Sequence, residues 1–207
     1  QFATYRDWAQ GGESTNSDAQ GVQEKADRDE LGAPANPEEQ IERSYKELIT
    51  TVETDILQRL HGVTPAQFES IIVDLLVAMG YGGGRPEMAK ALGRSGDNGV
   101  DGVVREDKLG LDVVYMQAKR YDPANSVGPG EVRDFVGALE GHRANKGVFV
   151  TTSRFAKSAL QYIEKVSKRV VLIDGPELAK LLVQHGVGVR VRARYDVKEL
   201  DEDYFAG

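Results

Sequence analysis

Asp101, Gln117 and Lys119 are the residues whose types and spacing first suggest chemistry. Gln117 and Lys119 are two residues apart in a Val-rich segment, so both project to the same face if that segment is a strand. A carboxylate oxygen, an amide oxygen and a nearby backbone carbonyl are hard ligands that suit Mg²⁺. A lysine beside such a metal positions or deprotonates a water and stabilises charge that develops on a phosphate.

Glu69 offers a second carboxylate for the same site. It lies just off the apolar face of a helix expected over residues 65–79, which precedes the Val-rich segments. The pattern Asp…Gln-x-Lys is short, so a solvated hairpin that carries the same side chains without chemistry is the alternative interpretation. Thr151, Thr152 and Ser153 carry hydroxyls but have no nearby histidine to activate one as a nucleophile.

Two antiparallel strands must bring these residues together. The segments 100–105 and 111–119 are rich in Val and are separated by a short polar loop, which predicts a β-hairpin. Residues opposite each other in such a pair have Cβ atoms about 5 Å apart. Asp101 begins the first strand and Lys119 ends the second, so we expect the two side chains to converge.

The rest of the chain predicts alternating helices and strands. The segment 187–195 alternates apolar residues with Arg190, Arg192 and Arg194, which predicts a half-buried strand with a cationic outer face. We expect one α/β domain, roughly 62–195, with helices on both faces of a mixed sheet. The other predicted elements are helices over 37–61, 65–79, 129–140, 155–166 and 177–185, and buried strands over 147–152 and 170–173.

The composition excludes several classes of protein. Among 207 residues there is no cysteine, which rules out a disulfide scaffold, a thiolate zinc site and a cysteine nucleophile. The three histidines are far apart in the sequence, which argues against a multi-histidine metal site. No stretch of 18 apolar residues occurs, so we expect no membrane-spanning helix and a cytoplasmic location.

The ends of the chain differ from its body. Residues 10–36 are rich in small and acidic residues and read as a flexible linker, because they cannot bury enough apolar surface to offset their ordering entropy. We divide the chain into an acidic tail at 1–36, a leading helix at 37–61 and a body at 62–207. The apolar stripe of the leading helix is core or a dimer seam. The first residue is Gln, so we expect a fragment of a longer protein.

Short blocks of residues at consistent spacing resemble the catalytic domain of Mrr-type restriction endonucleases. The resemblance covers about residues 37–205, and the order of the blocks is kept throughout. It is specific because many blocks agree rather than one pattern. The blocks are Phe68-Glu69, Leu75-Leu76, Met79-Gly80-Tyr81, Gly96-Asp97, Gly99-Val100-Asp101-Gly102, Gln117-Ala118-Lys119-Arg120-Tyr121, Phe135–Leu139, Lys146–Ser153 and Leu172–Gly175.

The resemblance implies a PD-(D/E)xK nuclease fold with an αβββαβ core. In this family Asp101 matches the aspartate that binds metal, and Lys119 matches the catalytic lysine. Gln117 stands where the wider superfamily has Glu or Asp, and Glu69 matches an acidic helix residue that completes the site. The proline of the superfamily name is replaced by Val100.

The neutral side chain of Gln117 removes one negative charge from the implied metal site. Metal affinity therefore depends more on Asp101, Glu69 and the backbone carbonyl of Ala118. The implied metal is Mg²⁺, with Mn²⁺ as a substitute. The implied reaction is hydrolysis of a phosphodiester in foreign, often methylated, duplex DNA, by attack of water that leaves a 5′-phosphate.

Full-length relatives in this family carry an N-terminal winged-helix domain that reads DNA, and residues 1–36 resemble the linker that follows it. Cutting both strands of a duplex needs two sites, so we expect a homodimer or a higher homo-oligomer. Two alternatives stay open. One is a catalytically inactive DNA-binding or assembly module of the same fold, and the other is a nuclease that acts on RNA or on recombination intermediates.

Arginines near the predicted site are candidates for DNA binding. Arg85 and Arg94 lie in the Gly-rich approach to the site, whereas Arg120 and Arg154 follow later strands. Contacts from such residues to phosphates would hold a duplex without reading its sequence. Arg120 is the strongest candidate because it adjoins Lys119, and ordinary solvated charges are the alternative for each residue. For the arginines of 190–194, contact with DNA and protection of a sheet edge remain equal alternatives.

Overall fold

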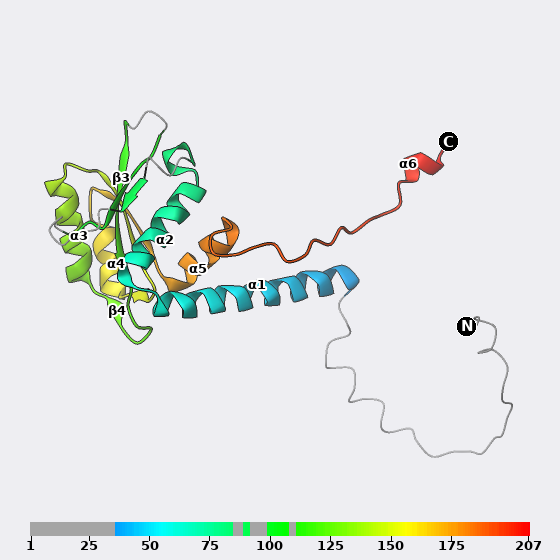
Figure 1. Ribbon diagram of the computed structural model, residues 1–207, viewed down its shortest axis with the longest axis horizontal. Helices are drawn as coiled ribbons and strands as arrows, with labels where there is room; N and C mark the ends of the chain where they lie inside the picture. Colours follow the sequence, from blue (N-terminus) through cyan, green and yellow to red (C-terminus); the bar gives the residue numbers. More distant parts are fainter. Residues whose placement is uncertain (1–35, 85–88, 92–98, 108–110) are drawn as a thin grey trace, which may run out of the picture. The chain divides into compact units, whose positions relative to one another are not determined.

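A computed structural model describes residues 36–84, 89–91, 99–107 and 111–207 (Figure 1). The chain divides into two compact units, residues 1–44 and residues 45–207. The described part of the first unit is the start of helix α1 (Pro37–Gly62), and the second unit holds all the other described elements.

The second unit is built on a mixed five-stranded sheet with the strand order β1-β2-β3-β5-β7. Strands β1, β2 and β3 pair antiparallel, whereas β3, β5 and β7 pair parallel, so β3 belongs to both halves of the sheet. The expected hairpin is confirmed as β2 and β3. The strands are β1 (Ala89–Ala91), β2 (Gly102–Arg105), β3 (Val113–Lys119), β5 (Lys146–Thr151) and β7 (Arg169–Ile173).

Helices cover both faces of this sheet, as the sequence predicts (Figure 1). The core clusters place α2 and α5 with the end of α1 on one face, and α3 and α4 on the other. The order α2, β1, β2, β3, α3, β5 is the expected αβββαβ core. The remaining elements are α2 (Pro65–Ala78), the 3-10 turn η1 (Tyr81–Gly84), α3 (Pro129–Gly141), α4 (Lys157–Ile163), α5 (Gly175–Gln184), α6 (Glu202–Phe205) and a small parallel pair of β4 (Ser126–Val127) and β6 (Arg154–Phe155).

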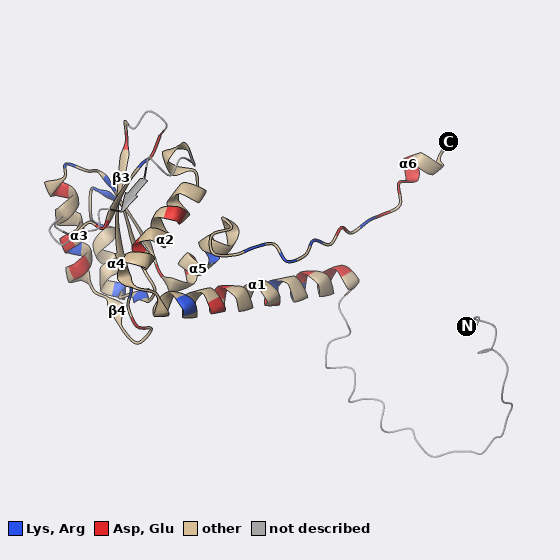
Figure 2. Cartoon of the chain, viewed as in Figure 1, with Lys and Arg blue, Asp and Glu red and all other residues tan. Residues whose placement is uncertain are grey.

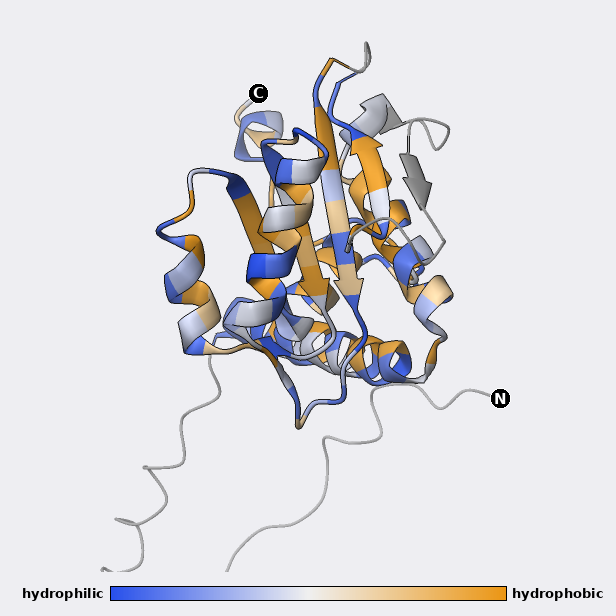
Figure 3. Cartoon of the chain, turned by 90° about the vertical axis from the view of Figure 1, so that its left-hand side faces the viewer, coloured by the Kyte–Doolittle hydropathy of each residue, from blue (hydrophilic) through white to orange (hydrophobic). Residues whose placement is uncertain are grey.

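Alternation along the strands produces the two cores. In β3, Val114 and Met116 face the α2 and α5 side, while Tyr115 between them faces α3 and α4. In β5, Val148 faces the α2 and α5 side, and Phe149 faces α3 and α4. Figure 3 shows the resulting hydrophobic strands between helices whose outer faces are hydrophilic. Because the side-chain period of a strand is two, this register also fixes which face the candidate site residues occupy.

Helix α2 begins where the sequence predicts it. Thr64 accepts a hydrogen bond from the backbone N–H of Gln67, and the Gln67 side chain accepts one from the backbone N–H of Thr64, which forms a capping box. Pro65 occupies the first helical position, where no N–H is needed. The buried face of α2 consists of Phe68, Ile72, Leu75 and Leu76.

The helix predicted over 155–166 is shorter than expected. Residues Arg154 and Phe155 form β6 and pair with Ser126 and Val127 of β4, so α4 begins only at Lys157. The prediction was wrong at this end because the pairing partner lies in a distant loop, which local helical periodicity does not reveal. The helix ends at Ile163.

The strand predicted over 187–195 is also wrong. This segment has no regular structure, and Val191 and Tyr195 are 71% and 89% exposed. Helices α3 and α4 connect the parallel strands across one face of the sheet, whereas α5 packs on the opposite face. If the segment after α5 paired in parallel with the free edge of β7, the connection through α5 would have the opposite hand to the connections through α3 and α4. Such left-handed connections are almost absent from proteins, so the segment has no place in its own sheet.

The apolar stripe of α1 is divided between solvent and core. Tyr45 and Leu48 are both 64% exposed, whereas Leu60 is buried and Ile56 packs against the core of the second unit. The core alternative therefore holds for the end of α1, and the dimer seam stays a prediction for its exposed part. Among the described helices, none is long and apolar enough to cross a membrane.

Candidate active site

Asp101 is fixed to strand β3 by its backbone and by its side chain. The backbone N–H of Asp101 donates to the carbonyl of Met116 at 2.9 Å, and the backbone N–H of Ala118 donates to Asp101 Oδ2 at 2.8 Å. The register pairs Gly102 with Met116, and the Asp101 N–H donates to the carbonyl of that same residue, so Asp101 lies directly before the first paired residue of β2. Its carboxylate lies at the backbone of Ala118, between Gln117 and Lys119 in the sequence.

Gln117 is a buried polar residue of β3. Only 6% of the residue is exposed. Gly99 lies next to it with φ +87°, and a Cβ at that glycine would approach Gln117 Nε2 to 3.7 Å. The amide oxygen of Gln117 is a hard ligand of the kind that Mg²⁺ prefers.

Glu69, on α2, lies in the same electrostatic environment. Its pKa is raised, first by burial, then by the negative charge of Asp101, while the positive charge of Lys119 opposes the rise. Two carboxylates that repel each other beside one ammonium group form an arrangement that a divalent cation stabilises. The structure thus brings the three charged residues of the sequence prediction within electrostatic reach of one another.

These residues fit a hard divalent cation only as a mixed ligand set. The described residues contain no cluster of three or more His, Cys, Asp or Glu side chains that could hold a metal ion. Asp101 and Glu69 supply two carboxylates, so the Gln117 amide and a backbone carbonyl such as that of Ala118 are needed to extend the set. All of these donors are oxygens, which suits Mg²⁺ or Mn²⁺ rather than zinc.

The candidate DNA-binding arginines have different positions. Arg120 Nη1 donates to the carbonyl of His61 at 2.6 Å, at the end of α1, although Arg120 is otherwise exposed. His61 Nδ1 is buried and has no hydrogen-bond partner in the structure. Arg154 is exposed in β6. Arg85 and Arg94 lie outside the described residues.

Sequence reasoning missed a group of three positioning residues, which we call the hydroxyl clamp: Thr151, Thr152 and Ser153. Thr151 Oγ1 donates to the carbonyl of Lys119 at 2.8 Å. Thr152 Oγ1 donates to the carbonyl of Tyr121 at 2.7 Å and accepts from the Tyr121 N–H at 2.8 Å. The clamp thus holds the backbone on both sides of Arg120, directly after the candidate lysine.

The clamp continues along the loop that follows β3. Ser153 Oγ donates to the carbonyl of Asn125, and the N–H of Ala156 donates to the carbonyl of Val127 at 2.9 Å. The Tyr121 hydroxyl donates to Glu131, and this hydrogen bond is the main reason that the pKa of Tyr121 is raised. The loop after β3 is therefore fixed by the loop after β5.

Burial is the signal that identifies the clamp. The buried polar residues of the described chain are Gln117 and the three clamp residues, and all four lie on β3 or directly beside its end. In the sequence, the clue was a run of three small hydroxyl residues directly after a fully apolar strand. Our sequence analysis tested that run only for nucleophilic chemistry.

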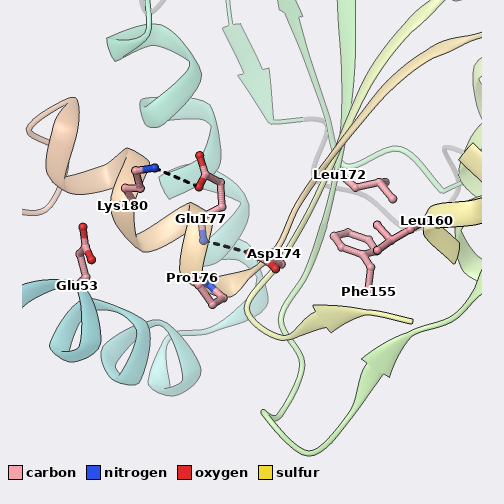
Figure 4. A pocket seen from close by; sticks show the side chains of 8 residues that line it. All are labelled: Glu53, Phe155, Leu160, Leu172, Asp174, Pro176, Glu177 and Lys180. Atoms are coloured by element: carbon pink, nitrogen blue, oxygen red, sulfur yellow. Dashed lines mark hydrogen bonds and ion pairs between the residues drawn. The ribbon is translucent and has the colours of Figure 1, made fainter. Parts of the chain in front are cut away.

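A separate pocket lies at the β7 edge of the sheet (Figure 4). It contains none of the four candidate catalytic residues. Its polar lining consists of three carboxylates and one ammonium group, and its apolar lining comes from β6, α4, β7 and the start of α5. The residues are Glu53, Phe155, Leu160, Leu172, Asp174, Pro176, Glu177 and Lys180.

The αβββαβ order around a mixed sheet defines the PD-(D/E)xK nuclease fold. The Mrr_cat family, described as a restriction endonuclease, matches residues 60–182. The chain is 42% identical over 179 residues to the type IV methyl-directed restriction enzyme EcoKMrr of Escherichia coli strain K12. That match covers 86% of this chain but 57% of the relative. The chain belongs to the Mrr catalytic-domain family of restriction endonucleases.

Two solved structures are similar to the chain. The DNA modification-dependent restriction endonuclease AspBHI matches with a TM-score of 0.51 and 25% identity, over 74% of this chain and 37% of that one. The MspJI restriction endonuclease in complex with a 27-mer oligonucleotide matches with a TM-score of 0.48 and 31% identity, over 63% of this chain and 31% of that one. The chain thus spans only part of each of these relatives.

Proposed function

We propose that this chain is the catalytic part of a Mg²⁺-dependent endonuclease that cuts modified duplex DNA. The observation that carries the proposal is the juxtaposition of Asp101, Gln117, Glu69 and Lys119 around one end of β3. The names of EcoKMrr and AspBHI, which are methyl-directed and modification-dependent, support modified DNA as the substrate class.

Each residue has a role that follows from its position. Asp101, Glu69, the Gln117 amide and the Ala118 carbonyl would hold a divalent cation, which would act as a Lewis acid and lower the pKa of a water molecule. Lys119 orients the attacking water and stabilises negative charge on the phosphate. Water attacks the phosphorus in line and gives up a proton, the bond to the 3′ oxygen breaks, the 3′ oxygen takes up a proton from solvent, and the phosphate remains on the 5′ side of the cut.

Arg120 and Arg154 are suited to hold the duplex. They follow the carboxyl ends of β3 and β5, which are adjacent parallel strands. Their guanidinium groups bind phosphates without reading bases, so affinity falls steeply with salt. Each site cuts one strand, and we therefore propose that a homodimer or higher homo-oligomer cuts both.

Incubation of methylated and unmethylated plasmids with Mg²⁺ or with EDTA tests the proposal. We expect cleavage of the methylated plasmid in Mg²⁺ and none in EDTA. Lys119→Ala should reduce the cleavage rate about 10³-fold, because loss of a group that assists proton transfer typically costs 10²–10⁴-fold. Lys165→Ala removes a lysine of the exposed turn after α4 and serves as the matched control.

A Lys119→Ala variant that cuts within a factor of about ten of the parent would remove this lysine from the mechanism. A parent chain that binds methylated DNA but never cuts it would instead favour the inactive DNA-binding module. Cleavage of an RNA duplex in preference to DNA would favour the alternative of a nuclease that acts on RNA. Because the chain spans 57% of EcoKMrr, the same assay on a chain extended by the preceding region tests where the methyl preference resides.

A further inference from the structure

Strand β7 is an unpaired edge of the sheet. It ends the strand order, and within the described residues only β5 pairs with it. Val171, in the middle of β7, is 56% exposed. An uncovered edge strand presents a row of free backbone N–H and C=O groups that template the addition of another strand.

The segment 187–195 has the pattern of a strand but no partner. Val189, Val191 and Tyr195 alternate with arginines, and Val191 and Tyr195 are largely exposed. Figure 2 shows its basic residues along an extended stretch that follows α5. A tail that only tracked DNA phosphates would not need an apolar residue at every second position, whereas an added strand does.

We propose that residues 187–195 of one copy of the chain add as a strand to the β7 edge of a second copy. Addition to β7 of the same copy is excluded by topology. Helix α5 returns across the face opposite to α3 and α4, so a strand following it beyond β7 would form a left-handed parallel crossover. A second copy has no such connection and places no constraint on direction.

The charge of the pocket beside the carboxyl end of β7 is complementary to the segment. The pocket that adjoins β7 is lined by Glu53, Asp174 and Glu177, with Lys180 as the one opposing charge (Figure 4). The segment carries three arginines and no acidic residue up to Tyr195. The Leu172 side of the pocket is apolar and suits the valines that alternate with the arginines.

The exchange is reciprocal in a two-fold dimer, because each copy has one 187–195 segment and one β7 edge. Such an isologous interface is closed and does not grow into a filament. The inference does not depend on the proposed nuclease activity, and association is therefore measured without DNA or metal.

Sedimentation velocity on the full chain and a pair of charge-reversed variants tests the proposal. The tail variant carries Arg190→Glu, Arg192→Glu and Arg194→Glu, and the edge variant carries Glu53→Lys and Glu177→Lys. We expect the parent to dimerise and each variant alone to raise the dimer dissociation constant at least tenfold. An equimolar mixture of the two variants should associate again, because each tail then meets an edge of opposite charge.

The control variant carries Arg133→Glu, Lys157→Glu and Lys165→Glu, at surface residues of α3, α4 and the turn after α4. Its net charge changes by the same amount as that of the tail variant, and it should dimerise like the parent. A tail variant that dimerises as tightly as the parent would overturn the proposal and leave the exposed stripe of α1 as the seam. A parent that stays monomeric at all concentrations would also overturn it. So would a tail variant that keeps dimerising but loses affinity for DNA, which would assign the segment to DNA instead.

Discussion

The two halves of the sheet contribute different kinds of residue to the same site. The antiparallel half, β1 to β3, brings the Asp101 carboxylate to the Ala118 N–H, and α2 adds Glu69. The parallel half, β3 to β7, contributes the hydroxyl clamp, which holds backbone carbonyls and carries no ionisable group. Strand β3 is common to both halves. In the proposed mechanism, one half therefore supplies the reacting groups, and the other fixes the backbone where β3 ends.

The largest effect should follow a change in the antiparallel half. Asp101→Asn keeps an oxygen that accepts from the Ala118 N–H but removes the charge that binds metal. We expect Mg²⁺-dependent cleavage to fall at least about 10³-fold, or about 4 kcal/mol of barrier. Calorimetry should show loss of Mn²⁺ binding with little change in Tm. If Asp101→Asn binds Mn²⁺ as the parent does, the metal site is elsewhere.

A change in the clamp should give an intermediate effect. Thr152→Val removes both hydrogen bonds to Tyr121 and keeps the side-chain shape. We expect kcat to fall about tenfold, or about 1.4 kcal/mol, while DNA affinity measured in Ca²⁺ stays within a factor of two. Thr152→Ser should restore the rate.

Thr54→Val is the matched control, because it also removes a hydroxyl that donates to a backbone carbonyl, on the exposed side of α1. It should leave kcat unchanged. If Thr152→Val lowers Tm without changing kcat below that temperature, the clamp only stabilises the fold and the division between the two halves fails.

A smaller effect is expected when the Gln117 amide is replaced by a carboxylate. Gln117→Glu restores a negative charge beside Asp101 and Glu69, so Mn²⁺ should bind more tightly and cleavage should stay within about threefold of the parent, less than ~0.7 kcal/mol. The added charge should also raise the pKa of Glu69 further. Weaker Mn²⁺ binding by this variant would show that the side chain at 117 does not face the metal.

The smallest effect concerns stability without metal. The raised pKa of Glu69 means that its favourable contribution is present below its ordinary pKa and is lost as the pH rises through the raised value. Glu69→Gln should therefore raise the Tm at pH 7, by ~2–4 °C for a chain of this size, and have almost no effect below pH 4. Differential scanning calorimetry in EDTA at the two pH values makes the measurement. An equal rise at both would show that ionisation of Glu69 is not the cause.

The fold was predictable where local pattern and tertiary environment agree. The Val-rich segments predicted β2 and β3, and the helix expected over 65–79 begins at Pro65. The prediction failed at Phe155 and over 187–195, because a strand requires a partner and the sequence does not state which edge is available. Over 187–195, the handedness of the connection through α5 excludes pairing with β7 of the same chain. That handedness depends on which face of the sheet α5 covers.

The proximity of the charged candidate residues was predictable from the sequence, but the contacts that hold the backbone beside them were not. Asp101, Gln117 and Lys119 share a hairpin, so their spacing alone placed them together. Thr151 and Thr152 bond to backbone carbonyls 32 and 31 residues earlier, and a carbonyl has no sequence signature. The roles of Arg85 and Arg94 stay predictions, because both lie outside the described residues.

The hydrogen bond from Arg120 to the carbonyl of His61 has a consequence for local unfolding. It joins the last turn of α1 to the end of β3 across 59 residues of sequence. Helix ends normally fray, and their amides exchange with solvent through small local openings. Here the final turn cannot open without releasing the residue next to Lys119, so its amides should exchange at the slow rate of the sheet, as part of one cooperative unit.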